Sequence, residues 1–267
     1  MKNFVEKNEE ILQKWEQEML KNREENFAPD GIMYRGKIIF NERESSIREQ
    51  DSNAENKLWN NAPLRLLFLT KDQNTGGDDA WDVREERFFS KNCLLKDGNR
   101  NFQYSLVYQS YGFINTDGVK IIQVNNVKRP DAIHVFDTCA LARINVKKQG
   151  GGSRISYNKL KTYIDKYKDF IKKQIENLDA DILVCCGHSD KIEKTGNMIL
   201  NFLNEHLYSF ERINDWIYYD TKQNKIAVDT YHLSASGYKG VCDEIMKAYH
   251  KFLVKHPDFL EKIRASR

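Results

Sequence analysis

From residue 65 onward, the hydrophobic positions of this chain form short continuous runs that alternate with longer periodic stretches. The run at 66–69 is too short for a helix, and similar runs lie within 181–187 and 226–230. Continuous apolar runs of this length are typical of strands buried on both faces, as in parallel sheets. We therefore predict strands at 65–70, 181–187 and 226–230, and a further strand, or a loop and a strand, at 132–144.

The stretches between these runs carry apolar residues at three- and four-residue spacing, which indicates amphipathic helices. The pattern is clearest at 157–177, where Leu160, Ile164 and Ile171 share one face. Helices are predicted at 4–20, 85–89, 102–113, 157–177, 191–207 and 238–254, and a hairpin arm at 216–220. Because strands and helices alternate, the predicted fold is a three-layer α/β/α sandwich with a mainly parallel central sheet.

Residues 1–61 are more polar than the segment that follows. After the helix at 4–20, we predict a turn at 28–31 (APDG), a short hairpin or irregular arm at 33–40, and a surface helix or loop at 41–61. We expect this N-terminal helix and arm to pack on an α/β domain formed by residues 62–267, so that the chain is one compact unit.

Composition excludes several classes of protein. The 267 residues are 40% hydrophobic, which is enough for a sizeable core. No apolar run approaches the roughly eighteen residues of a membrane span, and the N-terminus lacks the apolar stretch of a signal peptide. We therefore expect a cytoplasmic location and no membrane partner. Five cysteines without a CxxC pair argue against a zinc ribbon, an iron–sulfur cluster or a disulfide scaffold.

Positive charge is concentrated in one segment of the chain. The net charge is only +3, but residues 143–173 contain ten Lys or Arg and two Asp, which leaves eight positive charges in excess. A glycine run, Gly150 to Gly152, lies within this segment. Such a segment can bind the phosphates of a nucleic acid, or it can be a flexible loop beside a solvated helix face.

Polar residues of different chemistry follow three of the predicted strands: Asp72, Asn145 and His232. The carboxyl ends of parallel strands lie on one edge of a sheet, where open α/β folds bind their ligands. We therefore predict that the three side chains line one pocket at that edge. Each residue also has a structural interpretation, because Asp is a common helix cap, Asn a common turn residue, and His a common capping or buried side chain.

The order of these motifs resembles the uracil-DNA glycosylase superfamily over roughly residues 62–255. The matching features are a strand followed by x-x-Asp at Asp72, a strand ending in Asn145 before basic residues and glycines, the strand and glycine of ILVCCGHSD, and a strand followed by His-x-Ser at His232. The chain also resembles bacterial uracil-DNA glycosylase-like proteins with a Lys-Asp/Glu-x-Asn first motif. It departs from the superfamily pattern at Thr70, Gln73, Asn74 and Leu233.

The resemblance implies a uracil-DNA glycosylase-like fold and a metal-independent hydrolase that acts in DNA repair without a cofactor. In that family's chemistry, Asp72 would position the attacking water, Asn145 would bind the edge of the base, and His232 would stabilise the departing base. A flipped base would stack on Trp81 or Phe88. The resemblance implies substrate contacts for Lys71, Asn74, Trp81, Phe88, Lys147, Lys148, Gly151, Arg154 and Ser234, with nucleic acid, in particular DNA, as the partner.

Two other functions fit the same sequence. Asp72, Asp78, Asp79 and Asp82 could bind a divalent cation in a nuclease or phosphoesterase, because hard cations prefer oxygen ligands. The changed motif positions also fit a nucleic-acid-binding protein of the same fold that lacks catalysis. The sequence leaves open which of the three functions applies, which base is recognised, and whether the substrate is DNA, RNA or a nucleoside.

Overall fold

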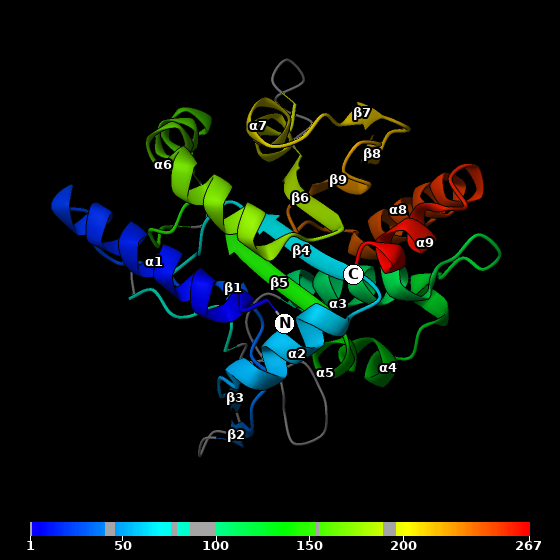
Figure 1. Ribbon diagram of the computed structural model, residues 1–267, viewed down its shortest axis with the longest axis horizontal. Coiled ribbons are helices and arrows are strands. Elements are labelled where there is room, and N and C mark those ends of the chain that lie inside the picture. The colour runs from blue at the N-terminus through cyan, green and yellow to red at the C-terminus, as the bar shows by residue number, and fades with distance from the viewer. Residues whose placement is uncertain (1, 41–45, 76–78, 86–99, 153–154, 189–195) are drawn as a thin grey trace.

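A computed structural model describes residues 2–40, 46–75, 79–85, 100–152, 155–188 and 196–267. Its centre is a seven-stranded sheet with the order β1-β5-β4-β6-β9-β8-β7 (Figure 1). The four middle strands are parallel: β5 (Ala140–Asn145), β4 (Arg65–Thr70), β6 (Ile182–His188) and β9 (Lys225–Tyr231). The outer strands run antiparallel to their neighbours: β1 (Gly31–Ile32), β8 (Ile217–Asp220) and β7 (Glu211–Arg212).

Strand β4 shows why a short apolar run forms the centre of the sheet. All six of its residues are buried, because β5 and β6 flank it and helices cover both faces. Leu66 and Phe68 join the hydrophobic cluster on one face, and Leu67 and Leu69 join the cluster on the other, as alternation along a strand requires. The predicted strands at 65–70, 181–187 and 226–230 are confirmed.

Helices form a layer on each face of the sheet (Figure 1). One layer contains α3 (Arg100–Asn115), α4 (Arg129–Ile133), α5 (Val135–Thr138), α8 (Tyr238–Lys255) and α9 (Phe259–Ala265). The other contains α1 (Phe4–Lys21), α2 (Ser52–Asn61), α6 (Tyr157–Leu178) and α7 (Met198–His206). The chain is thus a mixed α/β protein with a mainly parallel central sheet, as predicted.

Two predicted elements are corrected. Residues 129–138 form the short helices α4 and α5 before β5 begins, although 132–144 was predicted as strand or loop and strand. Pro130 lies in the first turn of α4, where its fixed φ favours helix initiation. The second is the helix predicted at 191–207. Among the described residues it begins at Met198 as α7, because the Asn197 side chain caps it: Asn197 Oδ1 accepts the N–H groups of Ile199 and Leu200. The predicted helix at 85–89 falls largely outside the described residues.

The N-terminal segment is part of the central core. Strand β1 pairs with β5 and extends the sheet, and Trp15 and Trp59 are fully buried among the helices of one layer. Trp15 stacks on Phe170 of α6 with ring centroids 5.6 Å apart. Strands β2 (Ile38–Phe40) and β3 (Ser46–Arg48) form a separate antiparallel pair beyond the main sheet (Figure 1).

The described residues also bear on two expectations from composition. Cys139, Cys185, Cys186 and Cys242 are free and buried, and Cys93 lies outside the described residues. Among the described helices, none has the length and apolar character needed to cross a membrane.

Candidate active site at the carboxyl edge of the sheet

The order of the parallel strands predicts where a ligand would bind. The chain passes from β4 to β5 on one side and then crosses to β6 on the other side of β4. A crevice forms at the carboxyl ends of strands where the order reverses in this way. Asp72 follows β4, Asn145 ends β5 and His232 follows β9, so these three residues lie at the same edge of the sheet, as predicted. That these side chains line one pocket stays a prediction.

Beyond the sheet, the segments after β4 and β5 continue side by side. The N–H of Val146 donates to Thr70 O at 2.9 Å, and the N–H of Lys147 donates to Lys71 O at 2.8 Å. Further along, Gly151 donates to Gln73 O, and Thr75 donates to Gly151 O, both at 2.9 Å. This extended pairing fixes the Asp72 loop against residues 147–151.

Asp72 and Lys147 form a partly buried pair. Asp72 Oδ2 lies 3.7 Å from Lys147 Nζ, and each side chain is only 12% exposed. Burial raises the pKa of Asp72 above its ordinary value, although Lys147 and Lys71 oppose the shift. A Cβ on Gly151 would lie 3.1 Å from Asp72 Oδ2, so a larger residue would crowd the carboxylate. The result is a carboxylate with few water neighbours, which makes it a stronger base than one in bulk water.

His232 is held in one tautomer. Its Nδ1 accepts the backbone N–H of Ser234 at 3.3 Å and lies 2.6 Å from Ser234 Oγ. A backbone N–H can only donate, so Nδ1 is the acceptor and the ring proton is on Nε2. Burial, together with the charges of Lys71 and Arg143, lowers the pKa of His232 to about 4. At neutral pH His232 is therefore an uncharged imidazole that can donate a hydrogen bond from Nε2.

This tautomer can be measured. We expect the ¹⁵N spectrum of the ring at pH 7 to show a protonated Nε2 and an unprotonated Nδ1, and the ring to stay neutral until the pH falls well below 6.5. The reason is that burial and two nearby cations disfavour the charged form. A His232→Gln variant assigns the resonance. A ring that titrates near pH 6.5 would contradict the burial seen here.

The charge of Lys71 acts on both Asp72 and His232. Lys71 is partly buried, and its positive charge lowers the pKa of both Asp72 and His232. Lys71 directly precedes Asp72 in the segment that follows β4. The candidate site therefore combines a carboxylate, an ammonium group and a neutral imidazole N–H.

The structure places Asn145 at the end of β5 in a buried position. Its side chain is fully buried, Oδ1 accepts from Thr70 Oγ1 at 2.5 Å, and Nδ2 has no hydrogen-bond partner in the described part of the chain. Its backbone N–H donates to Asp30 Oδ2 at 2.8 Å. Asp30 directly precedes β1, which pairs with β5, so this bond fixes the end of β5 beside β1. The contact of Asn145 with a base stays a prediction.

The prediction that Lys148 contacts phosphate is wrong. Its side chain is fully buried, and Nζ donates to Asp30 Oδ1 at 2.7 Å, to Asp30 Oδ2 at 2.6 Å and to Asn145 O at 2.9 Å. Burial lowers the pKa of Lys148 to about 8, against the opposing charge of Asp30. Neighbouring side chains of an extended chain point in opposite directions. Lys147 therefore faces Asp72, and Lys148 faces the interior.

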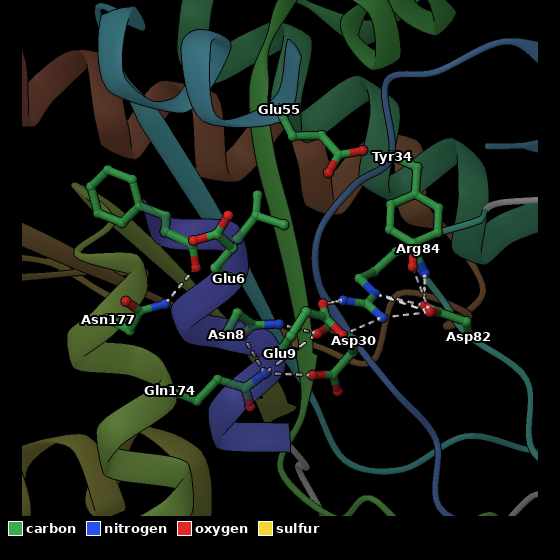
Figure 2. A network of polar contacts seen from close by, with 12 residues as sticks. Glu6, Asn8, Glu9, Asp30, Tyr34, Glu55, Asp82, Arg84, Gln174 and Asn177 are labelled. Carbon is green, nitrogen blue, oxygen red and sulfur yellow. Dashed lines mark hydrogen bonds and ion pairs between the residues drawn. The ribbon is translucent and has the colours of Figure 1, made fainter. Parts of the chain in front are cut away.

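A buried polar network includes Asp30, the carboxylate that bonds to Asn145 and Lys148 (Figure 2). Gln174 Nε2 donates to Asp30 Oδ1 at 2.8 Å and to Asn8 Oδ1 at 3.0 Å. These bonds link helices α6 and α1 to Asp30, which directly precedes β1. In the same view, Arg84 lies between Glu9 and Asp82 and contacts both. This pairing fastens the end of the Asp72 loop to α1.

The same network bears on the alternative of a metal centre. Both oxygens of Asp82 accept from Arg84, and Oδ2 also accepts the Tyr34 hydroxyl at 2.9 Å. Asp72 is paired with Lys147, Asp79 is exposed, and Asp78 lies outside the described residues. Across the described ranges, no group of three or more His, Cys, Asp or Glu side chains is placed to bind a metal ion.

The remaining predicted contacts are partly placed. Trp81 is 38% exposed, and its backbone is held by two hydrogen bonds to the Gln73 side chain, at 2.9 and 3.1 Å. Asn74 forms a parallel bridge with Gly151 and is exposed. Phe88 and Arg154 lie outside the described residues. Trp81 is thus partly open to solvent in the segment that follows Asp72, and Phe102, also partly exposed, lies with its ring centroid 5.9 Å from that of His232.

A further histidine at this edge was not among the predicted residues. His188 Nδ1 lies 3.3 Å from Asp229 Oδ2, and Asp229 Oδ1 accepts from Asn197 Nδ2 at 2.8 Å. An Asp that holds one ring nitrogen orients the imidazole, as in many acid–base sites. The signal in the sequence was a His at the end of one apolar strand and an Asp inside another, but only the sheet register brings the two together.

No protein-family model and no curated protein matches this chain. The functional assignment therefore depends on the chemistry of the residues described above.

Proposed function

We propose that the chain is a DNA glycosylase-like hydrolase that cleaves the N-glycosidic bond of a damaged or unusual base. The observation that carries the proposal is that one edge of the sheet holds both a partly buried carboxylate, Asp72, and a neutral imidazole, His232, that can donate from Nε2. Glycosidic cleavage develops positive charge on the sugar and negative charge on the departing base. Asp72 and His232 carry the charge and the donor that complement these two changes.

In the proposed reaction, a water molecule attacks the anomeric carbon while the bond from that carbon to the base nitrogen breaks. The electron pair of this bond leaves with the base, and the Nε2–H of His232 donates a hydrogen bond to the oxygen on which charge accumulates. Asp72 accepts the proton released by the water and, while ionised, stabilises the cationic sugar. The positive charge of Lys71 favours the ionised form of Asp72, against the effect of burial, and the neutral form of His232.

Three features support a nucleic-acid substrate. Trp81 is exposed beside the loop of Asp72 and can stack on an unpaired base. Helix α6 starts at the carboxyl edge, so Lys159 and Lys161 lie at the same end of the molecule as the site. Lys147 remains a candidate phosphate contact, whereas Lys148 does not.

The test is incubation with single- and double-stranded oligonucleotides that contain uracil, hypoxanthine, xanthine or an alkylated base. Base release leaves alkali-labile abasic sites, which are detected as strand breaks after heating in alkali. Release from at least one substrate is the expected result. Binding of these oligonucleotides without any release would instead favour the non-catalytic function, and strand cleavage without alkali would favour a nuclease.

Base release is expected to continue in excess EDTA, because the proposed base and donor are both side chains. The rate should fall as the pH is lowered through the raised pKa of Asp72, since the protonated carboxyl can neither accept a proton nor offer negative charge. Single-turnover rates with and without EDTA, and across pH 4 to 8, measure both effects. Loss of activity in EDTA that added Mg²⁺ restores would replace this mechanism with a metal-dependent one.

A further inference from the structure

A cavity lies at the amino edge of the sheet, opposite the candidate active site. It has a volume of about 540 Å³ and is formed where β4, β6 and β9 begin, next to the C-terminal residues. In Figure 1 the two ends of the chain lie near this edge, and Lys2 and Arg267 both line the cavity. Its size is that of a small-molecule site. Its lining is polar apart from the side chain of Ile263.

The charges that line this cavity are unbalanced. Arg65, Lys225 and Arg267 have side chains 7%, 10% and 14% exposed, so three cations are largely withdrawn from water. Two side-chain carboxylates, Asp179 and Asp181, line the same space. Lys225 Nζ also donates to Ala180 O at 2.7 Å, and Arg65 Nε donates to Trp59 O at 2.8 Å. Lys2 adds a fourth cation at the rim, 4.0 Å from Asp179, while Lys262 is paired with Asp258 outside the lining.

Each carboxylate is shared among several donors. Asp179 Oδ1 lies 2.7 Å from Lys225 Nζ, and its Oδ2 lies 3.7 Å from Arg65 Nη1. Asp181 Oδ2 accepts the backbone N–H of Arg65 at 2.6 Å and contacts Arg267 as well. The positive charge of Arg267 also contributes, after burial, to lowering the pKa of Arg65. The lining side chains thus include more cations than carboxylates, although each of the three buried cations already has a partner within the protein.

We propose that this cavity binds a small phosphate-bearing anion. Guanidinium groups offer parallel N–H donors that match phosphate oxygens, and binding an anion would compensate the excess positive charge. The side chains of Asn60, Gln223 and Asn224 can bond to hydroxyl groups of the same ligand. The lining contains no aromatic residue on which a nucleobase could stack, which favours a compact phosphate ester or pyrophosphate.

This site is independent of the proposed glycosylase activity and is tested with inorganic phosphate and pyrophosphate. We expect a saturable rise in the unfolding temperature with either anion, compared with NaCl at the same ionic strength, and a matching binding isotherm by calorimetry. The Arg267→Gln variant should weaken pyrophosphate affinity at least tenfold, because it removes a largely buried cation while Asp181 keeps the Arg65 N–H. Lys2→Gln, at the rim, should weaken it less than Arg267→Gln but measurably.

Two control variants locate the anion. Lys161→Gln removes an exposed cation on α6 and should leave pyrophosphate binding unchanged. Lys147→Gln removes a cation of the candidate active site and should also leave it unchanged. The proposal is overturned if neither anion stabilises the protein beyond NaCl, if Lys147→Gln abolishes binding, or if Lys2→Gln and Arg267→Gln both bind like the wild type. Should Arg267→Gln fail to fold, the result for Lys2→Gln decides.

Discussion

Replacing Asp72 by Asn is expected to lower the rate of base release by about 10² to 10⁴-fold while leaving the fold intact. Asn has nearly the same shape as Asp, but it can neither accept the proton of the attacking water nor offer full negative charge to a cationic sugar. The site is partly withdrawn from water, so the lost charge is not replaced by solvent. The measurement is single-turnover base release at saturating enzyme, with thermal unfolding of the same sample.

The matched control for this variant is Asp79→Asn, which removes a carboxylate from the same loop. Asp79 is exposed, so its replacement should leave both the rate and the unfolding temperature close to those of the wild type. Near-wild-type base release by Asp72→Asn would show that Asp72 does not activate water. If both variants lost activity equally, the cause would be a general effect of negative charge in the loop.

The strands that carry the site could be predicted from the sequence, because the local pattern of apolar residues determines them. A continuous apolar run such as that of β4 fits only a strand covered on both faces. Once the strands are parallel, Asp72 and His232 must lie on the same edge, whatever the rest of the chain does. The burial of Asn145 could not be predicted in this way, because its surroundings include Asp30, which lies 115 residues away in the sequence.

The burial of Lys148 also could not be predicted from the sequence. In a segment such as 143–173, which contains ten basic residues, a lysine is most simply interpreted as exposed, because lysine is rarely buried without a partner. Its partner, Asp30, lies 118 residues earlier in a predicted turn. Similarly, the Asp229 carboxylate and the His188 ring lie 41 residues apart and meet through strand register. Pairs of this kind follow from tertiary packing, which the pattern of one segment does not specify.

The buried pair of Asp30 and Lys148 leads to the largest expected effect on stability. Lys148→Met keeps most of the aliphatic volume but leaves the Asp30 carboxylate buried without its counter-charge, and we expect the free energy of unfolding to fall by about 3 to 5 kcal/mol. The carboxylate would keep its hydrogen bonds from Gln174 and from the N–H of Asn145, which do not replace a full positive charge. Urea unfolding, followed by circular dichroism at pH 7, measures the change.

Two further variants separate the charge effect from loss of packing. Lys161→Met removes an exposed lysine of an i,i+4 pair and should change the free energy of unfolding by less than about 0.5 kcal/mol. Asp30→Asn combined with Lys148→Met removes both charges and should recover part of the stability lost in the single variant, because no unpaired charge remains buried. A double variant as unstable as the sum of its single variants would show that the two side chains act independently. If Lys148→Met lowers the free energy of unfolding by less than about 1 kcal/mol, water reaches Asp30, and the segment that carries it opens readily.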